Sequence, residues 1–472
     1  MIRVLLVTMV IAVSPSAAQG VAGFVEDGVT SERLVGATVF APTEGVGAVT
    51  NGYGYFALPL RASADSVGLV VRYLGYDEGH VVVAVGGGPV RLRLTPGTAA
   101  VGAVTVEAGP SMLEPPGTFR LTARDVERAP ALLGEADPLK ALQLSPAVRF
   151  GSEGSTGLHV RGSSPDQTLL LLDGAPVYNA AHLAGAVSVF NSDALQSVAL
   201  VPGAPPARYG GRLAAVVDVA TREGSRDAYR GTATVGLLAS RALAEGPLGA
   251  RGSFLVAARR TYADVLLRPF VTEKGSGLGY GFYDATAKLS VDLDDRTRLF
   301  ASAYGGSDRF YTSSEETFDG SGKTERSSTA VDWGNTTATV RATRVLGDRA
   351  FVSALAYFSR YGFAAEREAA DDYPEASGRA DRAVAFRQSS GLRDFAVRSD
   401  LQLAAGPHAV EAGAILETRA FRPASVLRSR TVGADAEETV AEERIATLGG
   451  AVYVSDAVRV GAFRTEGGLR LG

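Results

Sequence analysis

The segment Ala287–Tyr304 reads AKLSVDLDDRTRLFASAY, and its pattern decides the fold. From Ala287 to Leu293 apolar residues alternate with polar ones, and after an Asp-Asp pair a second run, Arg298–Tyr304, leads back. Alternation with a period of two places the apolar side chains on one face of a strand. The segment therefore predicts an antiparallel β-hairpin with one apolar and one polar face.

The same hairpin pattern recurs through residues 225–472. Alternating runs around Val340 and Val352 meet at Gly347-Asp348, and a third pair of runs meets at Gly406-Pro407. Short turns on one side and long links on the other are typical of outer-membrane barrels, in which alternate residues face lipid and a polar lumen. This part predicts a partial antiparallel transmembrane β-barrel, and a soluble β-sandwich or propeller is the alternative. The links predicted to be long outer loops are Gly305–Ser328, Glu366–Ser390 and Arg422–Glu442.

The strand count indicates an incomplete barrel. The pattern gives roughly ten strands, whereas plugged import barrels have about 22. An open sheet in lipid leaves two edges of unpaired backbone groups, and each such group is costly. We expect a C-terminally truncated chain that forms no stable pore alone, and a barrel completed by several chains is the alternative.

The composition narrows the function classes. The chain has 472 residues, of which 56 are Gly and none is Cys, and its net charge is −4. A high glycine content without a G-X-Y period indicates many short strands and turns. The lack of Cys excludes disulfides, thiolate zinc sites and Cys nucleophiles. The charge argues against nucleic-acid binding.

The N-terminus predicts export. A basic start is followed by the apolar run Val4–Val13, which is too short to span about 30 Å of hydrocarbon as a helix. Ser16 and Ala18 then suit a cleavage site, so residues 1–18 are predicted to be a secretory signal peptide. An N-terminal anchor helix is the alternative.

Residues 19–96 predict a small β-sandwich, because short β-prone runs are separated by Gly and by Asn51-Gly52, a pair suited to a tight hairpin turn. The region contains the runs Gly23-Phe24-Val25-Glu26-Asp27, Gly36-Ala37-Thr38-Val39, Thr50-Asn51-Gly52-Tyr53-Gly54-Tyr55-Phe56 and Tyr73-Leu74-Gly75-Tyr76. With these runs it resembles the carboxypeptidase-regulatory-like domain. The resemblance implies a transthyretin-like β-sandwich that is an accessory module without peptidase activity.

Residues 97–119 predict a linker, since Pro and Gly punctuate it and prevent a long helix or a central strand. Within the linker, Val101–Glu107 (VGAVTVE) is β-prone. An extended segment flanked by breakers can add a strand to the sheet edge of another protein. A plain spacer is the alternative.

Residues 120–224 predict a mixed α/β segment. Pro138–Leu144 is expected to form a short helix, because Asp137 can cap it and proline suits the first helical position. Thr168–Leu172 is an apolar run of strand length, typical of a strand buried on both faces. Further candidate strands are Ser197–Val201 and Val216–Thr221.

The same segment carries an ordered set of motifs, which are Ala141-Leu142-Gln143 with Ser145-Pro146, Leu158-His159-Val160-Arg161-Gly162-Ser163, Leu172-Asp173-Gly174-Ala175-Pro176-Val177-Tyr178-Asn179 and Pro205-Pro206-Ala207-Arg208-Tyr209-Gly210-Gly211-Arg212. In this order they resemble the plug domain of TonB-dependent outer-membrane receptors that carry an N-terminal regulatory-like sandwich. The resemblance implies a mainly β chain, with an α/β plug domain at 120–224 inside the barrel of 225–472. The plug-motif candidates are Arg161, Gly162, Asp173, Gly174, Arg208, Tyr209, Gly210, Gly211 and Arg212.

The resemblance also implies a function, which is active uptake of an iron chelate, cobalamin or a glycan across the cell outer membrane. TonB, with its inner-membrane energising complex, would pull from the periplasm on the linker, where Val101–Glu107 takes the place of the TonB box. Other expected partners are the small-molecule or oligosaccharide ligand, a surface lipoprotein and outer-membrane lipid, but no nucleic acid. A signalling or adhesion receptor on the same scaffold is the alternative. The candidate TonB contacts are Val101, Val104, Thr105, Val106 and Glu107.

No catalytic, cofactor or metal site is predicted. The His residues are far apart and lack an H-E-x-x-H motif. Ser163, His159 and Asp173 lie in one segment, but no G-x-S-x-G motif surrounds the Ser. The chain is therefore expected not to be an enzyme.

Overall fold

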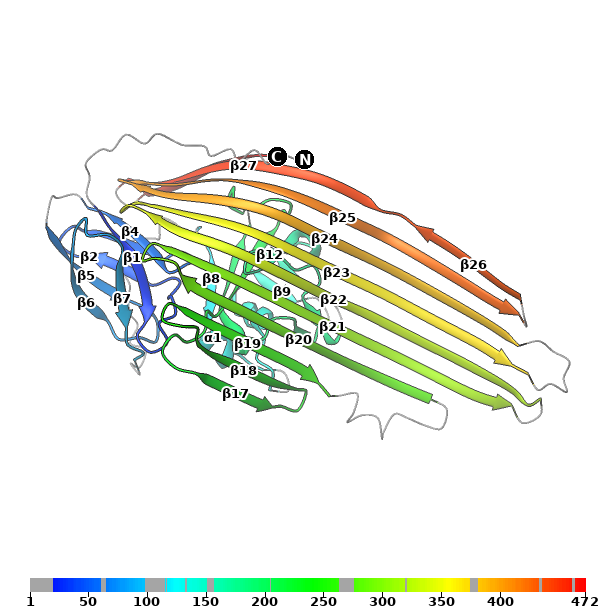
Figure 1. Cartoon of the computed structure of the whole chain (residues 1–472). Helices are drawn as coiled ribbons and strands as arrows, with labels where there is room; N and C mark the ends of the chain where they lie inside the picture. Colours follow the sequence, from blue (N-terminus) through cyan, green and yellow to red (C-terminus); the bar gives the residue numbers. More distant parts are fainter. Residues whose placement is uncertain are drawn as a thin grey trace.

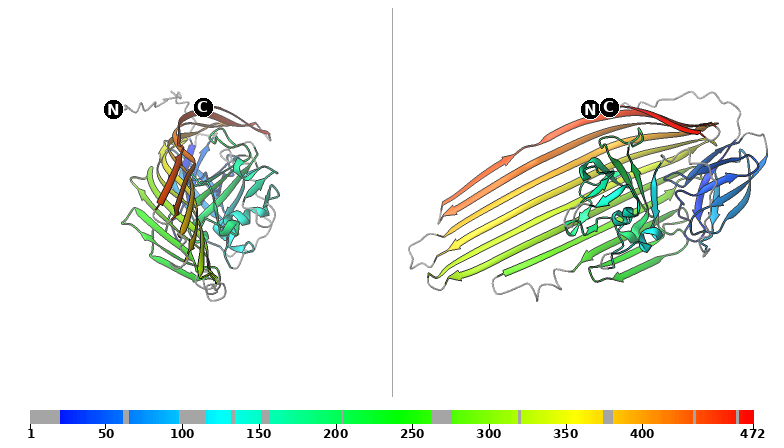
Figure 2. Two further views of the ribbon diagram at one scale, coloured as in Figure 1. Left: turned by 90° about the vertical axis from the view of Figure 1, so that its right-hand side faces the viewer. Right: turned by 180° about the vertical axis from the view of Figure 1, so that it is seen from behind.

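The structure is a computed structural model, and it describes residues 20–60, 65–97, 115, 117–131, 134–150, 157–203, 205–262, 276–318, 321–373, 381–432, 435–460 and 463–472. An N-terminal β domain lies at one end of a large twisted sheet, and an α/β plug lies against one face of that sheet (Figures 1 and 2). The predicted signal peptide at 1–18 and the candidate TonB box at Val101–Glu107 lie outside the described residues. Among the described residues, no helix combines the length and apolar character that a membrane crossing needs.

The N-terminal domain is the predicted β-sandwich. Its strands pair in the order β4-β1-β7 in one sheet and β3-β2-β5-β6 in the other. Side chains of both sheets, such as Val25, Phe56 and Leu69, share one buried core. The strands are β1 (Gly20–Asp27), β2 (Thr38–Ala41), β3 (Val46–Val49), β4 (Tyr55–Pro59), β5 (Ser66–Arg72), β6 (Gly79–Ala84) and β7 (Val90–Leu94).

The predicted tight hairpin turn at Asn51-Gly52 is wrong. The strands on either side of it, β3 and β4, belong to different sheets. The Asn51 side chain instead closes the crossing between the sheets, because its Oδ1 accepts hydrogen bonds from the Tyr53 and Tyr55 amides at 2.9 and 3.1 Å. The left-handed residue of this crossing is Gly54, with φ of 69°.

The plug is built on a five-stranded sheet of order β12-β11-β16-β15-β8, in which only β11 and β16 are parallel. The predicted strand Thr168–Leu172 is β11, and its neighbours cover both edges. The predicted helix begins where expected, because Asp137 Oδ1 accepts hydrogen bonds from the Leu139 and Lys140 amides. The elements are β8 (Phe119–Thr122), α1 (Ala123–Arg128), α2 (Pro138–Ala141), η1 (Leu142–Leu144), β9 (Val148–Phe150), β10 (Leu158–Val160), η2 (Pro165–Gln167), β11 (Thr168–Leu172), β12 (Ala175–Pro176), β13 (Ala181–His182), η3 (Leu183–Gly185), β14 (Val187–Ser188), η4 (Ser192–Ala194), β15 (Leu195–Pro202) and β16 (Ala215–Thr221).

The large sheet, the predicted partial barrel, is antiparallel and contains 12 strands, rather than the roughly ten expected from the sequence pattern. Among the described residues, its edge strands are β17 and β28, and β26 pairs with β25 alone. The predicted alternation holds: Lys288 and Ser290 are buried on the inner face, which the plug covers, whereas Leu289 is 46% exposed on the outer face. The strands are β17 (Arg230–Val235), β18 (Ala239–Pro247), β19 (Gly252–Thr261), β20 (Ser276–Asp292), β21 (Thr297–Phe318), β22 (Lys323–Leu346), β23 (Ala350–Asp372), β24 (Arg382–Ala405), β25 (His408–Val432), β26 (Asp435–Glu442), β27 (Ile445–Val460) and β28 (Phe463–Leu471).

The three predicted long outer loops are also wrong. Most of Gly305–Ser328, Glu366–Ser390 and Arg422–Glu442 continues as strand, and β21 pairs with β22 without a break as far as Phe318 and Lys323. These segments were predicted to be loops because they lack apolar alternation. Polar residues on both faces are equally compatible with a paired strand that is exposed to solvent on both sides. Strand pairing with a neighbour, which is a non-local contact, sets the length of these elements.

Candidate functional site

The plug motif Asp173-Gly174 forms a two-residue turn that joins β11 to β12. Leu172 pairs with Ala175 across this turn. Asp173 and Gly174 have φ of 49° and 87°. A tight hairpin turn of this type needs positive φ at both central residues, which Asp-Gly adopts at low cost. The backbone conformation of the turn therefore accounts for the presence of Asp and Gly at these two positions.

The same turn also contacts the inner face of the large sheet, which we call the wall. Asp173 Oδ1 is 3.1 Å from Lys288 Nζ on β20, and Arg341 Nη2 on β22 donates to the Asp173 carbonyl at 2.9 Å. A Cβ on Gly174 would lie 2.5 Å from that Arg341 nitrogen. Burial opposes ionisation of Asp173, but Lys288 and the hydrogen bonds from Thr221 outweigh burial and lower its pKa. The aspartate is thus held ionised against a buried lysine.

The second motif, Arg208-Tyr209-Gly210, contacts the wall farther along the sheet. Arg208 Nη1 lies 3.3 Å from Glu411 Oε1 on β25, and the Arg208 guanidinium carbon lies 4.7 Å from the centre of the Tyr209 ring. Burial raises the pKa of Tyr209 to about 12. A Cβ on Gly210 would lie 2.6 Å from Arg470 Nε on β28, so a larger residue would require the Arg470 side chain to move.

The remaining motif residues lie in turns of the plug. Arg161 and Gly162 form another turn with two positive φ angles, 51° and 80°, and both are exposed. Arg212 donates to the Gly211 carbonyl at 2.9 Å, and Gly211 has φ of 80°. The structure therefore brings Asp173 and Gly174 together with the wall, and Arg208 to Gly210 likewise. Arg212 interacts electrostatically with Asp394 on β24.

Sequence reasoning missed His182 as a contact between plug and wall. Its Nδ1 lies 2.6 Å from Asp308 Oδ2, and its Nε2 lies 3.3 Å from Asp284 Oδ2. The ring stacks on Phe282 with centroids 4.3 Å apart. Burial lowers the pKa of His182, but the hydrogen bonds to Asp284 and Asp308 outweigh burial and raise it. No signal in the sequence could have found it, because Asp308 lies in Gly305–Ser328, which was predicted to be a loop, and Asp284 precedes the predicted strand that starts at Ala287.

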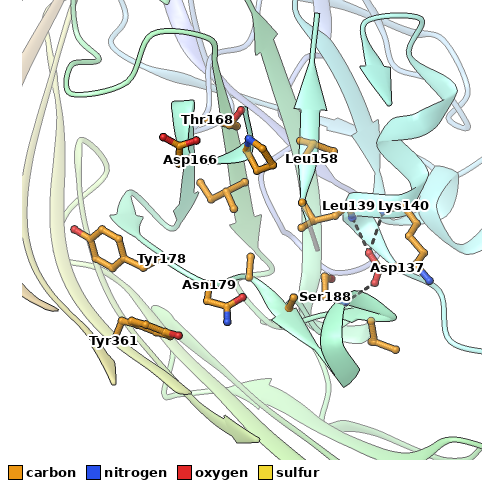
Figure 3. Close-up of a pocket in the computed structure, with 17 residues that line it drawn as sticks. Asp137, Leu139, Lys140, Leu158, Asp166, Thr168, Tyr178, Asn179, Ser188 and Tyr361 are labelled. Atoms are coloured by element: carbon orange, nitrogen blue, oxygen red, sulfur yellow. Dashed lines mark hydrogen bonds between the residues drawn. The ribbon is translucent and has the colours of Figure 1, made fainter. Parts of the chain in front are cut away.

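A cavity of about 370 Å³ opens between the plug and the inner face of β23 (Figure 3). This size is near the lower end of the roughly 300–1,000 Å³ typical of small-molecule sites. Asp137 uses its carboxylate to cap α2 and to accept from the Ser188 amide, so it is already satisfied (Figure 3). In the described part of the chain, the hydroxyls of Thr168 and Ser188 are buried without a hydrogen-bond partner, and Lys140, Asp166, Asn179 and Tyr361 are further polar residues of the lining.

The cavity lies on the side of the plug away from the N-terminal domain. Phe351, near the start of β23, stacks on Tyr55 of that domain with ring centroids 4.7 Å apart. Tyr361, which lines the cavity, lies farther along the same strand. The described residues contain no group of three or more His, Cys, Asp or Glu that could hold a metal ion.

Two family comparisons match the parts described above. The TonB-dependent Receptor Plug Domain matches residues 121–217, and the CarboxypepD_reg-like domain matches residues 21–106. The two matches together support a TonB-dependent receptor of the outer membrane. This is a receptor and transporter family, not an enzyme family.

Relatives of known name cover only part of this architecture. The ferrienterobactin receptor of Escherichia coli K12 is 26% identical over 140 residues, which are 26% of this chain and 18% of that protein. The ferric yersiniabactin uptake receptor from Yersinia pestis is 13% identical over 72% of this chain and 64% of its own, with a TM-score of 0.39. The alcaligin outer-membrane receptor of Bordetella pertussis is 13% identical over 75% of this chain and 62% of its own, with a TM-score of 0.38. We draw no conclusion from the two structural likenesses.

Proposed function

We propose that the intact receptor takes up an iron chelate across the outer membrane with energy supplied through TonB. The observation that carries this proposal is a plug seated on the wall by buried charge pairs, next to a cavity of ligand size. The similarity to a ferrienterobactin receptor favours an iron chelate over cobalamin or a glycan.

The seating of the plug explains why uptake needs energy. Lys288 with Asp173, and His182 with Asp308, are buried pairs that must separate before a passage opens along the inner face. Removing one partner of a buried pair costs about 3–5 kcal/mol. The outer membrane has no ATP, so the work is done from the periplasm, through the linker that precedes the plug.

The cavity offers a route by which a ligand can be sensed at the wall. Tyr178 and Asn179 line the cavity and also hold the plug in place. The Tyr178 hydroxyl donates to Asp394 on β24, and Asn335 Nδ2 on β22 donates to the Asn179 carbonyl at 2.5 Å. A ligand that rearranges these two residues would loosen the contacts that keep the plug seated.

The linker supplies the first test. Deleting Val101–Glu107 from the intact receptor is expected to abolish uptake of a radiolabelled ferric chelate while leaving its binding to cells unchanged. Val104→Pro should have the same effect, because proline cannot complete the hydrogen-bond ladder of an added strand. Val104→Thr, which keeps the β propensity, is the control and should retain uptake. Undiminished uptake after the deletion would refute the role of this segment.

The substrate class needs a separate test. A deletion strain that carries the intact receptor is grown with a ferric catecholate, cobalamin or a glycan as the limiting nutrient. We expect receptor-dependent growth on the ferric chelate alone. Growth on cobalamin or a glycan would contradict the proposed substrate, and binding without any uptake would favour a signalling receptor.

A further inference from the structure

The plug and the N-terminal sandwich cover successive parts of one stripe on the inner face of the wall. On β23, Ser359 Oγ donates to the carbonyl of Pro176 of the plug at 2.6 Å. Farther along β23, towards the short turns, Ser353 Oγ lies 3.4 Å from the hydroxyl of Tyr53 of the sandwich. Figures 1 and 2 show the sandwich in line with the plug, at the end of the wall where the short turns lie.

Neighbouring strands repeat this order. On β24, Asp394 accepts a hydrogen bond from the plug, and Gln402, nearer the short turn, accepts one from Asn51 Nδ2 of the sandwich at 2.8 Å. On β20, Asp292 at the short-turn end lies 3.3 Å from Arg91 Nη2 of β7. A passage that opens along the inner face when the plug leaves therefore runs into the sandwich.

One half of the contact between sandwich and wall is apolar. The sheet β4-β1-β7 presents Phe24 and Tyr55 to the wall, where they share a buried cluster with Phe351. Val345 and Ala404 belong to the same cluster, so the ends of three wall strands are covered. Buried aromatic contacts of this kind stabilise the docked position.

The other half of the contact is charged and its hydrogen bonding is incomplete. Glu26 is 1% exposed, yet neither of its carboxylate oxygens has a hydrogen bond within the described residues. Arg91 Nη1 and Arg93 Nε lie 3.5 and 4.0 Å from this carboxylate. A cavity of about 280 Å³ remains here, and Arg93 and Arg251, which line it, are both exposed. A buried carboxylate without a donor is costly, so this half holds the sandwich less firmly than the apolar half.

We propose, on the basis of the function proposed above, that the sandwich is a second closure in series with the plug and must leave the inner face before cargo passes. β7 leads into the linker through which the plug is pulled. The same work therefore acts on the sandwich. The charged half separates first, because Arg91 and Arg93 lie on β7.

The test locks the sandwich to the wall in the intact receptor. The chain contains no Cys, so the pair R93C/R251C can be joined across the cavity by a bis-methanethiosulfonate and released by a reductant. The locked receptor is expected to bind its cargo but to lose uptake, and reduction should restore uptake. In the matched control R251C/D295C, both cysteines lie on turns of the wall that line the same cavity, so cross-linking should leave uptake unchanged.

The outcomes separate the second closure from the proposed function. The cargo is the nutrient that supports receptor-dependent growth, so an error in the proposed substrate leaves the test valid. Full uptake by the locked receptor would overturn the second closure and leave the proposed function standing. Absence of uptake by the unmodified receptor would contradict the proposed function, and the second closure would fall with it.

A second measurement needs no lock. Ser353 is 2% exposed beneath Tyr53 of the sandwich. In S353C, the new thiol should react faster with a thiol reagent while cargo is being taken up than in cells that lack TonB. D295C is the control, because Asp295 is already exposed, and its thiol should react equally in both cases. Equal rates for S353C would mean that the sandwich stays on the wall during uptake, which would overturn the proposal.

Discussion

At the scale of single residues, His182 shows how the plug is fastened to the wall. The side chain is fully buried and faces Asp284 and Asp308 of neighbouring wall strands, while Trp333 Nε1 donates to the carbonyl of Ala181 next to it at 3.3 Å. A charged imidazole placed between two carboxylates stabilises this contact more than a neutral one would. The contact is therefore expected to depend on pH.

The expected direction follows from the raised pKa of His182. A raised folded-state pKa gives stability that is fully present below the unfolded value of about 6.5 and lost as pH rises through the folded value. Trp333 is the one tryptophan of the chain, so its fluorescence during urea titration reports plug release. The urea midpoint should fall as the pH rises through the raised pKa of His182.

The control variants separate this effect from general alkaline unfolding. His182→Gln should lower the urea midpoint at low pH and should weaken the dependence of the urea midpoint on pH. His159→Gln should leave the pH dependence unchanged, since His159 Nδ1 contacts only the Ser163 carbonyl within the plug. An unchanged pH profile in the His182 variant would show that this histidine does not carry the pH dependence.

At the scale of secondary structure, the β11–β12 turn and the Arg161-Gly162 turn form a natural pair for comparison. Gly174 and Gly162 have φ of 87° and 80°. A Cβ on Gly162 would meet nothing within 4 Å, whereas one on Gly174 would lie 2.5 Å from Arg341 Nη2 and 2.8 Å from Leu355 Cδ2. The two turns thus share backbone strain but differ in wall contact.

Substituting alanine at each turn isolates the contribution of the wall. Gly162→Ala should destabilise the plug by about 1 kcal/mol through backbone strain alone. Gly174→Ala should cost about 1–3 kcal/mol more, because Arg341 and Leu355 must move. The measurement is again the urea midpoint of Trp333 fluorescence. Equal losses for both variants would mean that the wall tolerates a side chain at Gly174.

The same elements show what local sequence patterns can predict. Thr168–Leu172 and the start of Pro138–Leu144 were predictable because strand length, N-capping and proline position are local rules. Pairs such as Asp173 with Lys288, and His182 with Asp308, join residues 115 and 126 positions apart. The alternation in the strands indicated which wall residues face inward, but no local pattern identifies their partners on the plug.

At the scale of the whole molecule, Glu32 joins all three parts. This residue of the N-terminal domain accepts hydrogen bonds through Oε1 from the Glu223 and Gly224 amides at 2.8 and 3.0 Å, just after the plug. Its Oε2 lies 3.4 Å from Arg222 Nε, and Arg222 Nη2 reaches Glu245 on β18 at 2.7 Å. One carboxylate therefore ties the sandwich to the plug and, through Arg222, to the wall.

Removing this carboxylate should loosen the sandwich. Glu32→Ala is expected to speed amide hydrogen exchange at residues 223 and 224 by about tenfold or more, since both amides lose their acceptor. Glu78→Ala is the matched control, because Glu78 pairs with Arg72 at the exposed surface of the same domain. Unchanged exchange at the two amides would mean that Glu32 does not hold the domain in place.

The length of the wall strands has a consequence for anything that approaches the cell. β25 contains 25 residues, whereas a tilted strand crosses the hydrocarbon with about 9–11. More than half of β25 therefore stands clear of the lipid as a stiff polar extension of the sheet. Anything that approaches the inner face from that end meets these polar strands well before it reaches the level of the bilayer.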